Sequence, residues 1–183
     1  MAVVERIEPA VHHRHPAGVR RQVLGVADPS MAEKMARVLA ARGAERVLVV
    51  HGDDGLDELT TTTKSKIWQV SGGEVVDFEL DPTDFGIKLV DQEVLVGGDA
   101  HFNAEVARSV FANQTSGNLG AVRDIVVLNA AAGVVTYELA KDSSRSDLDP
   151  SVRFQDAIER VTRTLESGAA AAKLSDWITA TQR

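Results

Sequence analysis

A strand, a helix and a second strand follow one another near the start of the chain, and this order constrains the fold most. The short apolar run 22-QVLGV-26 suits an inner strand, and Asp28 followed by Pro29 supplies a helix start. Apolar side chains then recur on one helical face until Gly43, and 46-RVLVV-50 is typical of a buried strand. Such a βαβ unit predicts two parallel strands joined by a right-handed crossover.

Later segments alternate less regularly. The runs 66-KIWQV-70 and 75-VVDFEL-80 flank the turn 71-SGGE-74 and predict a β-hairpin. Helices are predicted from Asp99, over 121–140, from 151 to Gly168, and over 169–180. Within the second of these, 125-IVVL-128 would also suit a strand, although the length and the alanines favour a helix. The predicted fold class is α/β, with a mostly parallel sheet flanked by helices and a β-hairpin.

Composition narrows the functional classes. The net charge of -7 argues against a general nucleic-acid binder, whose phosphate contacts need clustered Lys and Arg. The absence of cysteine excludes disulfides, thiolate metal sites and a cysteine nucleophile. No apolar run approaches the roughly 20 residues of a membrane helix, and charges interrupt the first ten residues, so neither a membrane segment nor a secretion signal is expected. We therefore expect a cytoplasmic protein.

The first 16 residues carry charge, two prolines and no sustained period, which predicts a flexible leader before an α/β domain over 17–183. The cluster 12-HHRH-15 places three histidines in four positions. Such a cluster is compatible with metal binding, although a mobile polar tail is the more ordinary interpretation.

The stretch 51-HGDDGLDELT-60 concentrates negative charge directly after the second predicted strand. Four acids, Asp53, Asp54, Asp57 and Glu58, lie within six positions. The carboxyl ends of parallel strands are where open α/β sheets bind ligands. Solvent, protonation or a cation must relieve the repulsion among these acids, and Mg²⁺ commonly binds one or two carboxylates together with substrate phosphates. The loop thus indicates Mg²⁺-dependent phosphate chemistry, with an ordinary acidic surface turn as the alternative.

Three other features have both a chemical and a structural interpretation. The glycines of 97-GGD-99 could cradle a phosphate, but a capped helix start explains them better. His51 could act as a general base, or it could be a hydrogen-bonded structural histidine. The threonines Thr60–Thr63 could bind oxyanions, or they could stabilise a turn. No nucleophile-elbow spacing occurs in the chain.

Four segments together carry a family resemblance: 20–59, 81-DPTDFGI-87, 97-GGDAHFNAEV-106 and 124-DIVVLNAAAGV-134. In order and spacing they resemble the carboxyl-terminal α/β part of anthranilate phosphoribosyltransferase, and the most specific motif is VHG-x-DGLDE. The resemblance runs from near Pro16 to the end of the chain. It implies part of a nucleoside phosphorylase/phosphoribosyltransferase-like domain.

The resemblance also implies a reaction. The family transfers the phosphoribosyl group of phosphoribosyl pyrophosphate (PRPP) to anthranilate in tryptophan biosynthesis, with Mg²⁺ as cofactor. Carried over by position, the family's metal-binding pair falls on Asp57 and Glu58, whereas Asp53 and Asp54 have no implied role. The resemblance assigns no covalent nucleophile, and it places no other substrate-binding or cofactor-binding residue in this chain.

Several family segments do not occur in the sequence. A complete member also has an amino-terminal helical domain, a GTGGD loop for the pyrophosphate, and NxST and KHGN segments that hold the substrates. Without them we expect the isolated chain to be inactive, and we expect exposed sheet edges to favour self-association or a complementing amino-terminal chain. A non-catalytic α/β remnant or assembly module is the alternative function.

Overall fold

The computed structural model describes residues 19, 21–142, 144–145 and 148–182. In chain order the elements are β1 (Arg21–Gly25), α2 (Pro29–Ala41), β2 (Arg46–Gly52), β3 (Ser65–Ser71), β4 (Glu74–Leu80), the 3-10 helices η1 (Pro82–Phe85) and η2 (Gln92–Leu95), α3 (Ala100–Phe111), α4 (Leu119–Lys141), α5 (Pro150–Glu166) and α6 (Ala169–Thr181). The expected leader over 1–16, with its HHRH cluster, lies outside the described residues, so the domain boundary at residue 17 stays a prediction.

The four strands form one mixed sheet in the order β1-β2-β3-β4. The β1 and β2 strands are parallel, as the βαβ pattern predicts, but β2 pairs antiparallel with β3, and β3 antiparallel with β4. The expectation of a mostly parallel sheet is therefore wrong. The segment 53–64 contains no helix, and without a crossover element the chain returns beside β2 in the opposite direction. The predicted hairpin is confirmed, with Gly72 and Gly73 in its turn at φ 59° and 88°.

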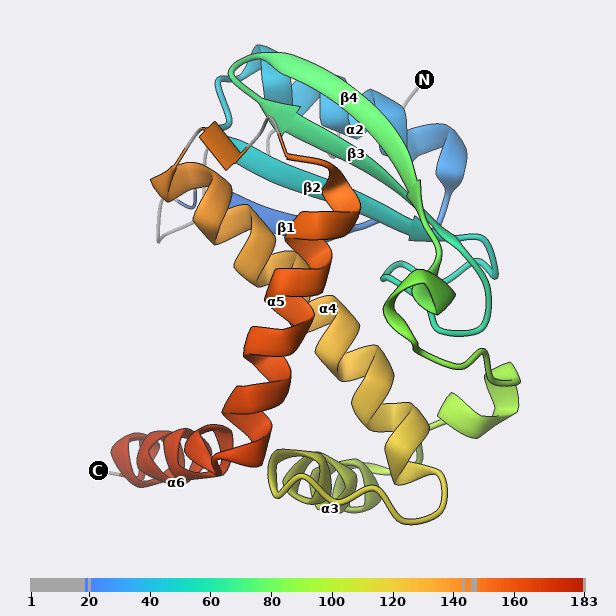
Figure 1. Ribbon diagram of the computed structural model, residues 1–183, viewed down its shortest axis with the longest axis vertical. Helices are drawn as coiled ribbons and strands as arrows, with labels where there is room; N and C mark the ends of the chain where they lie inside the picture. Colours follow the sequence, from blue (N-terminus) through green and yellow to red (C-terminus); the bar gives the residue numbers. More distant parts are fainter. Residues whose placement is uncertain (1–18, 20, 143, 146–147, 183) are drawn as a thin grey trace.

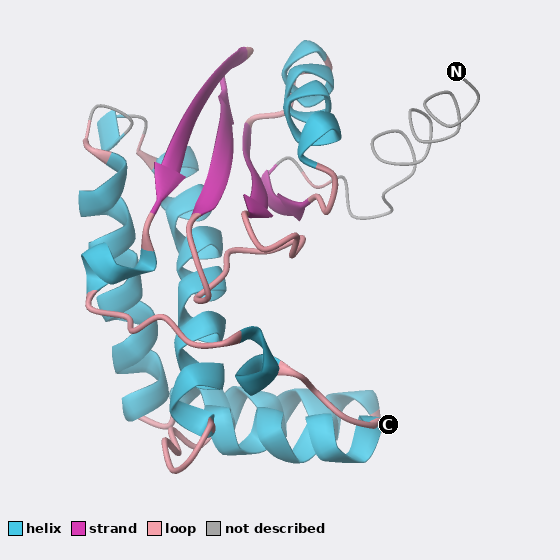
Figure 2. Ribbon diagram, turned by 90° about the vertical axis from the view of Figure 1, so that its right-hand side faces the viewer, coloured by secondary structure: helices cyan, strands magenta, loops and turns pink. Residues whose placement is uncertain are grey.

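Helices cover both faces of the sheet (Figure 2). On one face α2 packs in a cluster with Val47 and Val49, and on the other face α4 and α5 pack in a cluster with Leu48 and Val50. The alternating side chains of β2 are thus buried on both sides, which explains why this strand is a continuous apolar run. Beyond the sheet, α3 and α6 lie near the far ends of α4 and α5 (Figure 1).

The predicted helix starts are confirmed by their caps. Asp28 accepts a hydrogen bond from the Ser30 amide (2.9 Å), and Asp99 accepts one from the Phe102 amide (2.8 Å). Because a helix leaves its first amides without internal partners, these carboxylates stabilise the first turns. The capped-helix interpretation of 97-GGD-99 is therefore correct.

The long helix α4 is the centre of the second core cluster. It is the single helix in the described part of the chain whose length and composition would allow it to cross a membrane. The expectation that no apolar run approaches this length is therefore wrong. Its buried side chains, such as Leu128, Ala131 and Val135, pack with the sheet and α5. Core packing thus accounts for the buried side of this helix, and 125-IVVL-128 is helical.

Candidate functional site

A tight turn organises the acidic loop between β2 and β3. The strand continues through His51 and Gly52, two residues beyond the predicted run. The Gly52 amide donates to the Leu56 carbonyl oxygen (2.9 Å), and the Gly55 amide donates to the Gly52 carbonyl oxygen (2.8 Å). Gly55 adopts φ 93°, and a Cβ on Gly52 would lie 2.5 Å from Asp54 Oδ1. The left-handed φ of Gly55 therefore favours glycine in this turn, and a side chain at Gly52 would push against the Asp54 carboxylate.

Asp54 holds the loop together from within. Its Oδ2 accepts hydrogen bonds from the hydroxyls of Thr60 (2.6 Å) and Thr62 (2.5 Å), and its Oδ1 accepts one from the Leu56 amide (3.2 Å). Partial burial acts to raise the pKa of Asp54, but these hydrogen bonds outweigh it and hold the pKa below its usual range. Asp54 is thus a structural acid, and the two threonines stabilise the turn.

Glu58 is in the opposite situation. It makes no hydrogen bond or ion pair with any residue that the structure describes. Partial desolvation of its carboxyl raises the pKa of Glu58, and the negative charges of Asp57 and Asp54 raise it further. Both Asp57 and Glu58 are exposed, as is Asp53. A cation between Asp57 and Glu58 would relieve a repulsion that the described protein groups leave in place.

Two contacts fix the backbone on either side of this pair. A Cβ on Gly25, the last residue of β1, would lie 1.5 Å from the Asp57 carbonyl oxygen, so the loop rests directly on the end of that strand. Asn129 of α4 accepts a hydrogen bond from the Leu59 amide (2.9 Å) and donates one to the Leu59 carbonyl oxygen (2.7 Å). Asp57 and Glu58 are therefore placed at the carboxyl end of the parallel strand pair.

Sequence reasoning missed both contacts. The only signal for Asn129 is a single amide within the otherwise apolar stretch 125–135. Nothing in the sequence links Gly25 to the loop.

His51 is a structural residue. Its buried ring lies with Nδ1 2.9 Å from the Val26 carbonyl oxygen and so ties the ends of β1 and β2 together. This contact confirms the interpretation of His51 as a hydrogen-bonded structural histidine, because the hydrogen bond engages Nδ1 of the ring.

Asp57 and Glu58 would suit Mg²⁺ only together with oxygen atoms from a bound substrate or from water. Within the described ranges, no group of three or more His, Asp or Glu side chains is placed to hold a metal ion. Two carboxylates on an exposed loop are nevertheless the protein share of many Mg²⁺ sites, in which substrate phosphates and water complete the coordination. Asp57 and Glu58 fit that arrangement.

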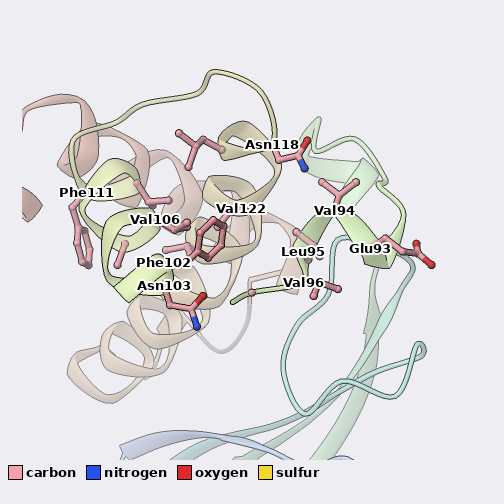
Figure 3. Close-up of a pocket in the computed structure, with 15 residues that line it drawn as sticks. Glu93, Val94, Leu95, Val96, Phe102, Asn103, Val106, Phe111, Asn118 and Val122 are labelled. Carbon is pink, nitrogen blue, oxygen red and sulfur yellow. The ribbon is translucent and has the colours of Figure 1, made fainter. Parts of the chain in front are cut away.

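A separate cavity of about 510 Å³ lies between η2, α3 and α4 (Figure 3). Its lining is mainly apolar, with Leu95, Phe102, Val106 and Val122 among the contributing side chains, and it includes neither Asp57 nor Glu58. The candidate metal site and this cavity are thus different features of the molecule.

Comparison with known proteins places the chain in a family. The model of the glycosyl transferase family, a/b domain, matches residues 14–171. An anthranilate phosphoribosyltransferase from Nocardioides sp. is 46% identical over 169 residues, which are 92% of this chain and 46% of that protein. One from Mycolicibacterium smegmatis is 46% identical over 164 residues, which are 90% of this chain and 43% of that protein. The chain spans less than half the length of these curated relatives.

Solved structures agree on the fold. Anthranilate phosphoribosyltransferase from Thermus thermophilus is 29% identical with a TM-score of 0.67, and the match covers 85% of this chain and 41% of that one. The enzyme from Saccharomyces cerevisiae in complex with PRPP and Mg is 22% identical with a TM-score of 0.68, over 85% of this chain and 41% of that one. The resemblance seen in the sequence is confirmed: this chain belongs to the glycosyl transferase family, whose a/b domain it carries, and it is a partial homologue of anthranilate phosphoribosyltransferase.

Proposed function

We propose that this chain is the α/β part of an anthranilate phosphoribosyltransferase, and that Asp57 and Glu58 hold Mg²⁺ against the diphosphate of PRPP. The observation that carries the proposal is the unpaired Glu58 carboxylate beside Asp57, at the carboxyl end of a parallel strand pair. The relatives at 44–46% identity carry that enzyme's name, and the Saccharomyces cerevisiae enzyme has been solved with PRPP and Mg. We expect such a biosynthetic enzyme to act in the cytoplasm.

The chemistry explains why a clamp of two acids is useful. Transfer of the phosphoribosyl group builds positive charge at the anomeric carbon and negative charge on the departing diphosphate. Mg²⁺ bound there would neutralise the leaving group's charge. The role of Asp57 and Glu58 is to hold and orient that cation, for which Glu58 must be ionised despite its raised pKa. Asp54 is less available for this role, because Thr60 and Thr62 donate to its Oδ2 and the Leu56 amide donates to its Oδ1.

The isolated chain is proposed to bind Mg²⁺ with pyrophosphate but not to catalyse the phosphoribosyl transfer. The family's GTGGD, NxST and KHGN segments are absent from the sequence, and much of the catalytic advantage of a transferase comes from such positioning groups. The purified chain with PRPP, Mg²⁺ and anthranilate should leave the anthranilate fluorescence unchanged. Loss of that fluorescence would show that this half is sufficient.

Calorimetric titration of Mg²⁺ with pyrophosphate tests the metal site. We expect Glu58→Gln to weaken binding by about tenfold or more, because a two-carboxylate site loses one of its charged ligands. Asp53→Asn is the matched control, since it removes one charge from another exposed acid of the same loop, and its affinity should stay within about twofold of the parent. Equal affinities for the parent and Glu58→Gln would instead favour the alternative function, a non-catalytic α/β remnant or assembly module.

A further inference from the structure

Asn129 is a polar residue on the apolar side of α4. Ile125 and Ala132, which lie one turn before and one turn after it on the same face of the helix, are buried apolar residues. Asn129 itself is half-buried. A side-chain amide removed from water costs free energy unless its donors and its acceptor find partners. The partners of Asn129 therefore show what this residue does in the fold.

The Asn129 amide pairs with both backbone groups of Leu59. Its Oδ1 accepts a hydrogen bond from the Leu59 amide (2.9 Å), and its Nδ2 donates to the Leu59 carbonyl oxygen (2.7 Å). Nδ2 also donates to the Ile125 carbonyl oxygen (3.0 Å). Residues of antiparallel strands exchange the same pair of hydrogen bonds between their backbones. Asn129 thus serves Leu59, which is completely buried, as a substitute for a strand partner.

These bonds anchor the segment that carries the acid pair. Within the described ranges, residues 57–59 make no hydrogen bond other than the two that join Leu59 to Asn129. The next residue already has a separate anchor, because the Thr60 amide donates to Ser65 Oγ (3.0 Å). Hydrogen bonds thus fix the backbone of this three-residue segment from α4 and not from the sheet.

A second asparagine makes the same pairing away from the acidic loop. Asn103 of α3 accepts a hydrogen bond from the Gly98 amide (2.9 Å) and donates one to the Gly98 carbonyl oxygen (2.9 Å). It lies at the apolar cavity between η2, α3 and α4 (Figure 3), whose lining includes neither Asp57 nor Glu58. The two asparagines therefore hold a loop by matching bonds, and they differ in which loop they hold.

We propose that Asn129 is a positioning residue of the metal site, which acts on Asp57 and Glu58 by holding the backbone of Leu59. The peptide unit between Glu58 and Leu59 is planar, so a hydrogen bond to the Leu59 amide also orients the backbone of Glu58. Mg²⁺ demands near-ideal octahedral geometry, so two carboxylates that share it tolerate little displacement. This inference rests on the proposed function, because it concerns the Mg²⁺ site assigned there.

The test is calorimetric titration of Mg²⁺ with pyrophosphate against the parent chain, Asn129→Ala and Asn103→Ala. Asn129→Ala keeps both carboxylates, yet it should bind about tenfold more weakly, as metal sites do when a residue that orients their ligands is lost. Asn103→Ala removes the matching pair of bonds and should stay within about twofold of the parent. Amide hydrogen exchange of peptides covering 53–64 should accelerate in Asn129→Ala and not in Asn103→Ala.

Thermal unfolding of each variant shows whether it is folded at the temperature of the titration. If Asn129→Ala is unfolded, Asn129→Gln takes its place. Glutamine keeps the donor and the acceptor, but its additional methylene displaces the amide from Leu59, so binding should weaken by about fivefold or more.

Two results would overturn the positioning role while the parent binds. One is parent-like affinity in the folded Asn129 variant, and the other is equal weakening by Asn103→Ala, because the loss would then act through general stability. If the parent chain itself does not bind Mg²⁺ with pyrophosphate, the proposed function fails, and this inference fails with it. The affinity of the parent therefore distinguishes the two failures.

Discussion

Asp54 and Glu58 belong to the same short loop, yet the fold treats them in opposite ways. Asp54 accepts three hydrogen bonds, which hold its pKa low, whereas Glu58 has no described partner, and burial and neighbouring acids raise its pKa. A cluster of acids is therefore not one chemical unit. The acid whose two oxygens both accept hydrogen bonds stabilises the loop, and the acid whose charge is uncompensated is the one able to gain from a cation.

The largest effect on stability and metal binding is expected from a substitution that displaces the backbone of Asp57 and Glu58 and leaves both carboxylates in place. Gly25→Ala places a Cβ where it would lie 1.5 Å from the Asp57 carbonyl oxygen, so strand or loop must shift. We expect about 3 kcal/mol lower free energy of unfolding, together with loss of Mg²⁺–pyrophosphate binding. Urea denaturation and calorimetry measure the two effects.

The control for this change is Gly133→Ala in α4, where an added Cβ meets nothing within 4 Å. Removing a helical glycine there should raise the free energy of unfolding by roughly 0.5–1 kcal/mol. If Gly25→Ala were equally harmless, β1 would not position the acid pair.

A smaller effect separates the two acids directly. Asp54→Asn leaves one acceptor oxygen where the carboxylate uses two, so at least one of the three hydrogen bonds is lost, and it should lower the free energy of unfolding by about 2 kcal/mol. Glu58→Gln should not destabilise the fold, because it removes a repelled charge. Denaturant unfolding of both variants without Mg²⁺ measures this contrast. The reverse order of stabilities would mean that the roles of these acids are exchanged.

The smallest effect is a difference in pH dependence. Asp54 has a lowered pKa, so its contribution to stability is present above its unfolded pKa and is lost as the pH falls through its folded pKa. Glu58 has a raised pKa, so its contribution is present below the unfolded pKa and is lost as the pH rises through the folded pKa. Unfolding of the parent, Asp54→Asn and Glu58→Gln across the acidic range should therefore show opposite trends.

These trends appear in the difference between the free energy of unfolding of each variant and that of the parent. The deficit of Asp54→Asn should disappear as the pH falls, and the advantage of Glu58→Gln should appear only as the pH rises. Parallel curves for the two variants would contradict the assigned pKa shifts.

The sequence predicted the local elements well, because periodicity and capping are local signals. The helix starts at Asp28 and Asp99 and the turn at Gly72 and Gly73 needed only neighbouring residues. The prediction of strand direction was wrong, because direction depends on whether the chain crosses over the sheet after residue 52. Residues 53–64 form no helix that could make such a crossover.

The candidate site divides in the same way. Its acids are visible in the sequence, but their different roles depend on contacts with residues elsewhere. Asn129 holds Leu59 across a separation of 70 residues, and Gly25 lies against Asp57 from another strand. Periodicity carries no information about such contacts, so the anchors of the loop could not be predicted.

The hydrogen bonds from Asn129 to Leu59 have a thermodynamic consequence for any cation that arrives. Because Asn129 of α4 already holds the main chain next to Glu58, cation binding restricts mainly the side-chain rotations of the acids. Preorganisation of this kind lowers the entropic penalty of complex formation.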